Sequence, residues 1–473
     1  MAKLRGETDV PVIAIVGGGA SGTLTAVHLL RLSRSHGVPM RVVVIDRYGR
    51  HGVGQAYATD DPLHLLNACA DKMSAFPDDP GHLLRWARTI GLEVAGSDFL
   101  PRQVYGRYLC HVLDTAVAEA WPYGRLARVT GTASELHVPG PRGPVRVALS
   151  DGTGVDADAV VLATGNLPTA DWPVAAAAGH RYIADPWEPG ALGRIRGGRA
   201  VLVIGTGLTM IDVALTATRA RSDAVVYAIS RHGLLPRPHR CPPPAPVPTD
   251  LPDGPLRLAE LVRAVRRAVR DNGGEWQAVV DGLRPHIPRL WARLGHDDQR
   301  RFLRSVARYW EVHRHRLPPA AAARIAELRS SGRLHVLRGT LTGVTAEGEL
   351  LTARVTGANG RTRDLVVDRI VNASGPSSPL SGNPLYRRLF AAGLARPDRL
   401  HLGVDADEDG AVLDATGRPS DRIFTLGPPL RGLRYETTAI PEIRAQAAAL
   451  APRLLETVAA ASSPRLQPGG LPR

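Results

Sequence analysis

The stretch that decides the fold is Val12 to Leu30, with the sequence VIAIVGGGASGTLTAVHLL. Its first five residues are apolar and mostly β-branched, which is typical of a buried strand in a parallel sheet. Gly17, Gly19 and Gly22 follow with the spacing G-x-G-x-x-G, and the chain then continues as a predicted helix. The order of strand, glycine turn and helix predicts a dinucleotide-binding unit of α/β type.

Each of these three glycines has a separate physical role in such a unit. The first permits the tight turn after the strand, the second lets the backbone approach a diphosphate, and the third lets helix and strand pack closely. The N–H groups at residues 20–22 and the positive end of the helix dipole also favour a diphosphate. The residues predicted to bind it are Gly17, Gly19, Ser21 and Gly22.

An acidic residue supports the same interpretation. A second predicted strand at residues 41–45 (RVVVI) ends in Asp46, which lies 24 residues after Gly22. An acid at this place can accept hydrogen bonds from both hydroxyl groups of a ribose, whereas the alternative is a surface acid at a strand end. Because strand, turn, helix, strand and acid occur in order, we favour a dinucleotide site over a glycine-rich loop in an ordinary α/β core.

The middle of the chain repeats this pattern. Residues 200–204 (AVLVI) form a predicted strand, 205–207 (GTG) a turn and 208–218 a helix, and the next strand ends in Ser230-Arg231 instead of an acid. The missing acid removes repulsion of a 2′-phosphate, and an arginine supplies a bidentate donor. We therefore predict NADPH, with NADH as the possible substitute; the alternative is an arginine on a solvated strand end. The predicted contacts are Gly205, Gly207, Ser230 and Arg231.

Two similar strand ends divide the chain into halves. ADAVVLATGN (157–166) and DRIVNASGP (368–376) each indicate a buried strand followed by small residues and glycine. Small residues are needed where a cofactor passes a strand end, which predicts contacts at Thr164 and Gly165; a plain turn is the alternative. A strand ending near Gly427, which is also a predicted cofactor contact, and a helix at 437–450 are predicted to complete the first domain.

The predicted fold class is therefore α/β, with two Rossmann-like dinucleotide-binding domains. A discontinuous FAD domain covers residues 1–190 and 370–450, and the NAD(P) domain is inserted at 195–369 with a helical insert at 256–330. Residues 451–473 are predicted to be a C-terminal tail. Two such domains predict one bound FAD and one transient nicotinamide coenzyme.

The charge pattern argues against nucleic-acid and membrane partners. The net charge of +14 rests on 59 basic residues, of which only Lys3 and Lys72 are lysines. The arginines are scattered, whereas nucleic-acid sites usually cluster basic residues. Residues 12–30 are apolar enough to suggest a membrane span, but their glycines and hydroxyl groups favour a soluble strand and helix. We expect a small-molecule substrate, no nucleic acid and no membrane partner.

The cysteines and histidines exclude two further kinds of site. Cys69, Cys110 and Cys241 are widely spaced and odd in number, which argues against a disulfide framework and fits a reducing cytoplasm. The sequence has no C-x-x-C pair, so electron transfer through a redox disulfide is not expected. His313 and His315 point apart on a helix, and we predict no metal site.

Several longer stretches are together highly specific and resemble a known family. They are IAIVGGG (13–19), GVGQAYATDDPLHLLNACADKMSAFPDDP (52–80), VLVIGTGLTMIDVAL (201–215), ISRHGLLPRPH (229–239), NASGP (372–376) and YETTAIPEIRAQA (435–447). The chain resembles, from about Val12 to Ala448, the bacterial FAD/NAD(P)-binding proteins of the flavin-dependent urate hydroxylase and aspartate N-monooxygenase-like group. More distantly it is similar to class B flavin monooxygenases, although their F-x-G-x-x-x-H signature is not present.

The resemblance implies that residues 52–80 pass beside the isoalloxazine ring of the flavin. There Asn67 would hydrogen-bond the flavin without titrating, and Tyr57 would stack against it. With His64, these are the predicted catalytic residues. The alternative is that His64 and Asn67 satisfy backbone groups of their own loop.

The leading functional hypothesis is an FAD-dependent, NAD(P)H-using monooxygenase. The resemblance and the missing redox cysteines predict that reduced flavin reacts with O2 to form a C4a-(hydro)peroxide, which hydroxylates a small polar substrate. The first alternative is an NAD(P)H:acceptor oxidoreductase that never oxygenates. The second is a flavin-binding basic protein that engages nucleic acid through its Arg-rich helices.

Overall fold

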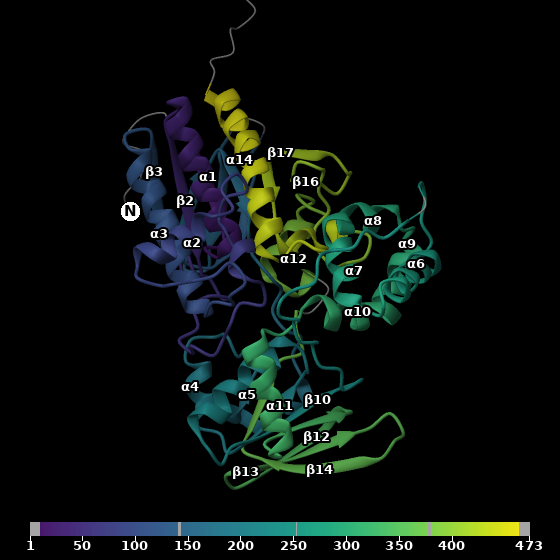
Figure 1. Cartoon of the computed structure of the whole chain (residues 1–473). Helices are drawn as coiled ribbons and strands as arrows, with labels where there is room; N and C mark the ends of the chain where they lie inside the picture. The colour runs from purple at the N-terminus through teal and green to yellow at the C-terminus, as the bar shows by residue number, and fades with distance from the viewer. Residues whose placement is uncertain (1–9, 141–142, 252, 377–379, 463–473) are drawn as a thin grey trace, which may run out of the picture.

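The computed structural model describes residues 10–140, 143–251, 253–376 and 380–462. Figure 1 shows three parts: a first domain of sheet and helices that contains both the first strand and the last helix, a second such domain below it, and a group of short helices at one side. The second domain and the short helices are inserted between strands of the first sheet.

The first domain is built on a six-stranded sheet. In spatial order its strands are β16 (Ala411–Leu413), β17 (Pro419–Thr425), β7 (Ala159–Leu162), β1 (Val12–Val16), β2 (Met40–Asp46) and β3 (Gly124–Thr130). All neighbours pair in parallel except β16 and β17. β1 and β7 lie in the middle and are almost entirely apolar, because both faces of the sheet are covered.

Helices cover one face of this sheet. They are α1 (Ala20–His36), α3 (Arg102–Ala120) and α14 (Ile440–Ser462), with the shorter α2 (His82–Thr89) beside them. β17 pairs with β7 and α14 packs along α1, so the C-terminal strand and helix return to the first domain where the sequence predicted them. The helix continues to Ser462, so residues 451–462 are helical and the expected tail is wrong there; residues 463–473 lie outside the described residues. None of the described helices is long and apolar enough to cross a membrane.

A small antiparallel sheet covers the opposite face. Its strands are β4 (Ala133–His137), β5 (Val145–Leu149) and β6 (Gly154–Ala157). Leu136, Val145 and Val147 of this sheet join the buried residues of β1 and β7 in one core, together with α12 (Pro384–Ala391).

The second domain repeats the plan with a five-stranded parallel sheet. In spatial order its strands are β11 (Leu334–Arg338), β10 (Val225–Ser230), β9 (Ala200–Ile204), β15 (Arg369–Asn372) and β8 (Tyr182–Ile183). The helices α4 (Ala191–Arg196), α5 (Leu208–Ala220) and α11 (Pro319–Ser330) pack on one face. The antiparallel strands β12 (Thr340–Glu347), β13 (Leu350–Thr356) and β14 (Thr362–Val367) cover the other face.

The short helices form a third part, which we call the helical insert. They are α6 (Leu258–Asp271), α7 (Trp276–Leu283), α8 (Ile287–Arg293), α9 (His296–Arg301) and α10 (Ala307–Arg314). Their core includes Trp291 and Phe302 and also Tyr435, which follows α13 (Arg431–Arg434) of the C-terminal part. The insert thus packs against residues from the end of the chain, whereas α11, which lies in the predicted range 256–330, belongs to the core of the second domain.

Candidate functional site

The turn between β1 and α1 depends on glycine at three places with different surroundings. Gly17 has a φ of 118°, and a Cβ there would overlap the carbonyl oxygen of Ala163. A Cβ at Gly22 would overlap the carbonyl oxygen of Gly17, because the helix sits directly on the strand end. At Gly19 the nearest atom to a Cβ would be 3.7 Å away, so packing does not demand glycine. A backbone left bare at Gly19 fits close approach of a ligand.

Helix α1 begins without a side-chain cap. Its N-cap is Gly19, and the Thr23 N–H donates to the Gly19 carbonyl at 2.9 Å. The N–H groups of residues 20–22 are therefore those that an α-helix leaves without an internal acceptor. Together with the positive end of the helix, they fit the diphosphate of FAD. The predicted contacts Gly17, Gly19, Ser21 and Gly22 all lie at this turn, which we call, with Asp46, the first cradle.

Asp46 lies at the end of β2, beside the glycine turn. Its Oδ2 accepts a hydrogen bond from the N–H of Gly18 at 3.2 Å, and its Oδ1 accepts from those of Tyr48 and Arg50 at 3.0 and 2.9 Å. These donors fix the orientation of the carboxylate but leave part of its roughly four acceptor sites for ribose hydroxyls. A Cβ at Gly18 would lie 2.8 Å from that of Asp46, so Gly18 belongs to the same arrangement. The spacing motif did not single out Gly18.

The remaining contacts predicted for the first cofactor lie at the ends of neighbouring strands. Gly427 has a φ of 74°, and a Cβ there would lie 2.6 Å from Ser21 Oγ, so the end of β17 adjoins the start of α1. Gly165 follows β7 with a φ of 71°. The hydroxyl of Thr164 is hydrogen-bonded to the buried Tyr386 hydroxyl at 2.7 Å. Gly427 and Ser21 are thus brought together, while Thr164 is tied to α12.

The second cradle, defined as the turn after β9 with the end of β10, has the same construction. Gly205 has a φ of 121°, and a Cβ there would overlap the Ala373 carbonyl. Gly207 is the N-cap of α5, with no side-chain cap and nothing within 4 Å of a Cβ. Ser230 ends β10; its hydroxyl contacts Thr206 Oγ1 and accepts the Gly233 N–H, both at 2.9 Å. The exposed Arg231 follows. With serine in place of the acid, this strand end fits a 2′-phosphate.

Two of the predicted catalytic residues lie in different surroundings. The ring of Tyr57 packs against Tyr105 with centroids 4.8 Å apart, and burial raises the pKa of Tyr57 to about 12. Its phenol stays protonated near neutral pH and can donate a hydrogen bond but not act as a base. The Tyr105 hydroxyl is buried and has no hydrogen-bond partner among the described residues. Asn67 lies where the domains meet, and its backbone carbonyl accepts a hydrogen bond from His239 Nε2 at 3.0 Å.

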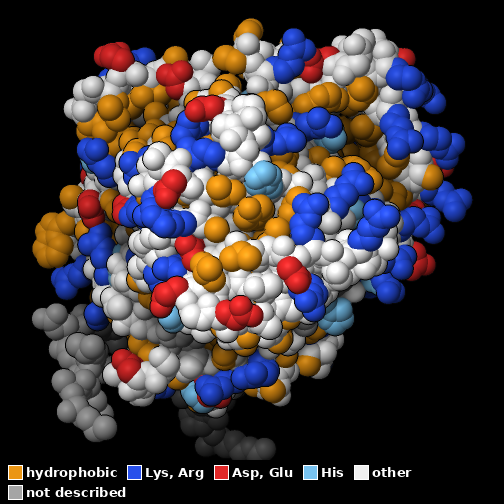
Figure 2. Space-filling view, turned by 90° about the horizontal axis from the view of Figure 1, so that it is seen from below, with side chains coloured by type: hydrophobic (Ala, Val, Ile, Leu, Met, Phe, Trp, Pro, Cys, Tyr) orange, Lys and Arg blue, Asp and Glu red, His pale blue; other side chains and the backbone are white. Residues whose placement is uncertain are grey.

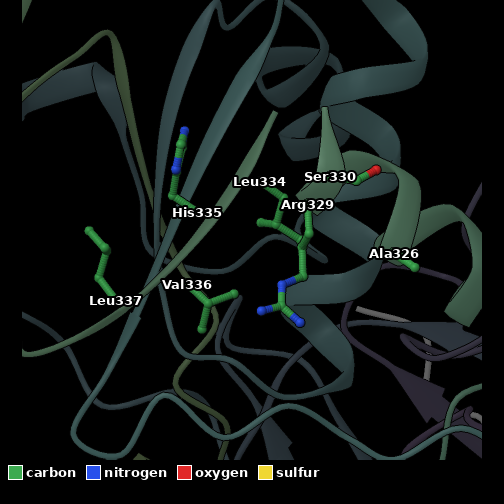
Figure 3. A pocket seen from close by; sticks show the side chains of 7 residues that line it. All are labelled: Ala326, Arg329, Ser330, Leu334, His335, Val336 and Leu337. Atoms are coloured by element: carbon green, nitrogen blue, oxygen red, sulfur yellow. The ribbon is translucent and has the colours of Figure 1, made fainter. Parts of the chain in front are cut away.

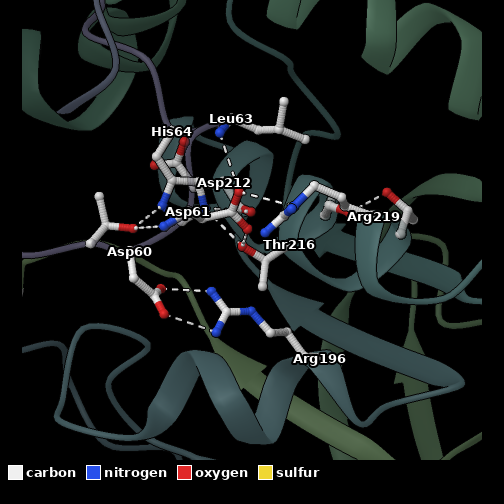
Figure 4. Close-up of polar contacts among 11 residues, drawn as sticks. Asp60, Asp61, Leu63, His64, Arg196, Asp212, Thr216 and Arg219 are labelled. Carbon is white, nitrogen blue, oxygen red and sulfur yellow. Dashed lines mark hydrogen bonds and ion pairs between the residues drawn. The ribbon is translucent and has the colours of Figure 1, made fainter. Parts of the chain in front are cut away.

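The third, His64, lies in the contact between the two domains (Figure 4). Its ring is fully buried, with Nδ1 2.7 Å from Thr59 Oγ1. Nε2 lies 2.8 Å from Thr216 Oγ1 and 3.1 Å from the Asp212 carbonyl oxygen. Both ring nitrogens are engaged, so neither is free to exchange a proton with a substrate. The described partners of the ring are the Thr59 hydroxyl and two groups of α5, whereas the alternative in the sequence analysis was a bond to backbone groups of its own loop.

Two aspartates beside His64 attach the same loop to the second domain (Figure 4). Asp61 is fully buried, accepts the Thr216 hydroxyl at 2.9 Å and lies 3.3 Å from Arg219. Asp60 accepts two hydrogen bonds from Arg196 of α4, at 3.0 and 2.6 Å. Sequence reasoning missed these contacts, because an Asp-Asp pair in a loop carries no spacing signal.

A buried ion pair adds to this contact. Arg102 of α3 lies 2.9 Å from the Asp212 carboxylate of α5, and both side chains are largely buried. Burial raises the pKa of Asp212, while the charge of Arg102 acts in the opposite direction. Arg102, Asp212 and Asn67 also line a small cavity of about 10 Å³ between the domains. The domain contact therefore combines buried polar groups from both sides with apolar residues such as Leu65 and Ile211.

A more open cavity of about 530 Å³ lies at the edge of the second sheet (Figure 3). It is lined by Ala326, Arg329 and Ser330 of α11 and by residues 334–337 of β11. None of the predicted site residues lines it, and we assign it no part in cofactor binding. Among the described residues, no group of three or more His, Cys, Asp or Glu side chains is placed to hold a metal ion.

Comparison with known proteins gives a family match for part of the first domain. Residues 14–167, from β1 through the end of β7, match the model of a family described as FAD-NAD(P)-binding. The comparison with curated proteins gives no match. The glycine turn, Asp46, Thr164 and Gly165 all lie within the matched range.

Solved structures resemble the chain over nearly its whole length. Reduced ornithine hydroxylase from Pseudomonas aeruginosa has a TM-score of 0.64 at 15% identity, covering 95% of this chain and 100% of that one. L-lysine 6-monooxygenase from Pseudomonas syringae gives 0.64 at 16% identity, with the same coverage. FAD-bound cadaverine monooxygenase from Erwinia amylovora gives 0.61 at 13% identity, covering 98% and 99%. Thioredoxin reductase from Lactococcus lactis gives 0.51 at 13% identity, covering 96% and 100%.

At these identities the likeness establishes the fold. The family match covers the first cradle, and the second cradle has the same construction. Residues 14–167 are an FAD-NAD(P)-binding domain, and the chain as a whole has the two-domain α/β fold of the solved enzymes that it resembles.

Proposed function

We propose that the protein is an FAD-dependent, NADPH-using monooxygenase that consumes O2 and hydroxylates the amine nitrogen of a small polar substrate. The observation that carries this proposal is the pairing of two uncapped glycine cradles in one chain, in a fold that matches ornithine hydroxylase over 95% of the length. The cradles supply places for two dinucleotides, and the activities of the similar solved enzymes supply the reaction class.

The free cysteines favour this proposal over disulfide reduction, although thioredoxin reductase shares the fold. Cys69 is buried, Cys110 is partly buried and Cys241 is exposed, and none of them forms a disulfide. Burial raises the pKa of Cys69 to about 11, so its thiol is protonated and unreactive at neutral pH. The chain therefore lacks the paired thiols that pass electrons from a flavin to a disulfide substrate. Free thiols also fit a cytoplasmic location.

In this proposal the first cradle binds FAD. The N–H groups at the start of α1 bind its diphosphate, and the Asp46 carboxylate accepts the ribose hydroxyls. Gly427 and Ser21 meet at the same helix end, so a side chain at position 427 would crowd the start of α1. FAD, when bound, accepts hydride from the nicotinamide and supplies the reaction with O2. Thr164 and Gly165 border the same sheet edge.

The second cradle binds NADPH by the same physical means. The start of α5 receives the diphosphate: Gly207 leaves the backbone open, and Gly205 permits the tight turn before it. Ser230 presents no negative charge and Arg231 is exposed beside it, which favours the 2′-phosphate of NADPH over the free hydroxyl of NADH.

The contact between the domains positions one cradle relative to the other. His64 and Asp61 of the first domain both bind Thr216 of α5, the helix that starts at the second cradle. We assign His64 to positioning, and we keep Tyr57 and Asn67 as candidates for contacts beside the flavin. Neither of these two is an acid or base near neutral pH, so they would orient and solvate reacting groups without exchanging protons.

Purified protein tests the proposal directly. We expect bound FAD, oxidation of NADPH in preference to NADH, and stimulation of NADPH and O2 consumption by one member of a panel containing ornithine, lysine and cadaverine. With ¹⁸O2, mass spectrometry should find one labelled oxygen in the hydroxylated product. Equal turnover with a quinone under argon, together with no incorporation of label in the ¹⁸O2 experiment, would contradict the proposal and select an NAD(P)H:acceptor oxidoreductase.

A further inference from the structure

Basic residues lie at the edge of the second sheet where β10 and β11 end. β10 and β11 run in parallel, with Ser230 opposite Arg338, so the residues that follow β10 lie next to the last residue of β11. Arg338 Nε donates to the His232 carbonyl oxygen at 3.0 Å. A Cβ at Gly233 would lie 3.0 Å from Arg338 Cγ, so the arginine stem crosses the turn. Arg231 and Arg338 thus lie at the same edge of the sheet, where β10 and β11 end.

The helical insert reaches this same edge through α10. Past the turn, the chain meets the C-terminal end of α10, where the Arg237 N–H donates to the Val312 carbonyl at 2.8 Å. Arg308 precedes Val312 by one helical turn and therefore lies on the same side of α10. Burial lowers the pKa of His232, and the charges of Arg308, Arg231 and Arg338 lower it further. Arg308 therefore contributes to the positive charge around this turn.

These arginines lack anionic partners. Within the part of the chain that the structure describes, Arg231, Arg308 and Arg338 form no ion pair with a carboxylate. The Nε of Arg308 is buried without a hydrogen-bond partner there. Figure 2 shows Lys and Arg side chains gathered toward the side of the molecule on which the helical insert lies. An unpaired cluster of guanidinium groups is suited to a dianionic phosphate.

We propose that Arg308 of the helical insert and Arg338 of β11 join Arg231 in binding the 2′-phosphate of NADPH. The coenzyme then bridges two parts of the molecule, because α10 belongs to the insert and β11 to the second domain. This inference rests on the proposed function in taking NADPH as the coenzyme. It adds that specificity for NADPH depends on residues far from the glycine turn in sequence.

The test uses binding of fragments to the FAD-loaded protein, measured by titration calorimetry. Adenosine 2′,5′-bisphosphate carries the 2′-phosphate, and adenosine 5′-monophosphate lacks it. We expect Arg308→Gln and Arg338→Gln each to weaken binding of the bisphosphate about tenfold and to leave the monophosphate unchanged. Arg266→Gln is the matched control, because Arg266 is an exposed arginine on α6 of the same insert. It should change neither.

The outcomes separate this inference from the proposal beneath it. If the parent prefers the bisphosphate and Arg308→Gln retains that preference, the inference fails and the proposed NADPH specificity stands. If the parent binds both fragments equally, both fail. If Arg308→Gln weakens both fragments alike, Arg308 supports the fold of the site and does not read the 2′-phosphate. Slower hydrogen exchange in residues 307–314 on adding the bisphosphate, but not the monophosphate, would support contact with α10.

Discussion

The two glycine turns of this molecule have nearly the same backbone. Gly19 has φ and ψ of −77° and −168°, and Gly207 has −82° and −166°. The N–H of Gly17 donates to Ile45 at 2.8 Å, just as that of Gly205 donates to Ile229 at 2.8 Å. This register makes Ser230 the counterpart of Asp46. Similar backbone geometry therefore recurs although the side chains around it differ.

The differences lie in the side chains that surround the turns. Gly22 corresponds to the fully buried Met210, and His28 of α1 corresponds to Thr216 of α5. In the first domain the helix presses on the strand end and allows no side chain at that position. In the second, α5 carries contacts to the other domain. The first turn is thus packed tightly against its strand, whereas the helix of the second also connects the two domains.

Gly22→Ala should have the largest effect of these variants on stability and should separate the two turns most clearly. Its Cβ would meet the Gly17 carbonyl, which belongs to the backbone and cannot rotate away. We expect a loss of about 3 kcal/mol or more in the free energy of unfolding, and loss of bound FAD. Gly207→Ala is the matched change in the second cradle, where a Cβ has open space, and should leave folding intact. Circular dichroism and visible flavin absorbance check both; full flavin content in Gly22→Ala would contradict the steric argument.

Thr216→Val should show how far the second helix depends on the domain contact. Valine keeps the shape but leaves His64 Nε2 and the buried Asp61 each short of a partner, which we expect to lower the free energy of unfolding by about 2–3 kcal/mol. Thr218→Val is the control, because the Thr218 hydroxyl bonds only to the Ala214 carbonyl of its own helix. Urea unfolding measures both variants. Equal effects would show that the domain contact adds no stability.

His28→Leu changes the residue of α1 that corresponds to Thr216, and its effect is expected in the pH dependence of stability. Burial lowers the pKa of His28 from 6.5 to about 4, so the unfolded chain takes up a proton that the folded protein refuses. Stability is therefore lost as the pH falls from 6.5 toward 4. Removing this histidine should recover about 2 kcal/mol near pH 5. Unfolding in urea at acidic and neutral pH checks it, with exposed His36→Gln as control; an equal acid loss in parent and His28→Leu would overturn this assignment.

Asp46→Asn should have the smallest effect, a weaker retention of FAD, and should distinguish the end of β2 from the end of β10. The amide keeps the shape but not the charge, and we expect FAD to be retained about tenfold less tightly. Ser230→Ala, the matched change at β10, should leave FAD retention unaltered. Titration of the apoprotein with FAD, followed by flavin fluorescence, measures both. Unchanged retention in Asp46→Asn would mean that the carboxylate only orders its own loop.

The sequence predicted the elements whose cause is local. The apolar, β-branched runs at β1, β2, β9 and β10 form parallel strands, because both faces of each sheet are covered and apolar side chains are favoured on both. Glycines at fixed spacing permit the turns, and the family match covers the first of them. The expectation of a tail directly after residue 450 was wrong, because α14 continues and buries Ala451, Leu454 and Val458 in the core of the first domain.

The role of His64 could not be predicted in this way. Its ring binds Thr216, which lies 152 positions away, and no spacing rule relates the two. The same holds for Arg102 with Asp212, since these two residues meet only after the two domains have packed.

By itself the sequence determined the two dinucleotide-binding units, their order along the chain and the serine and arginine that end the second, because strand, turn and helix form from residues close in sequence. Only the tertiary structure decided how the two domains contact each other and which polar groups join them. Those groups are distant in the chain, and their hydrogen bonds exist only once water has been excluded from the contact between the domains.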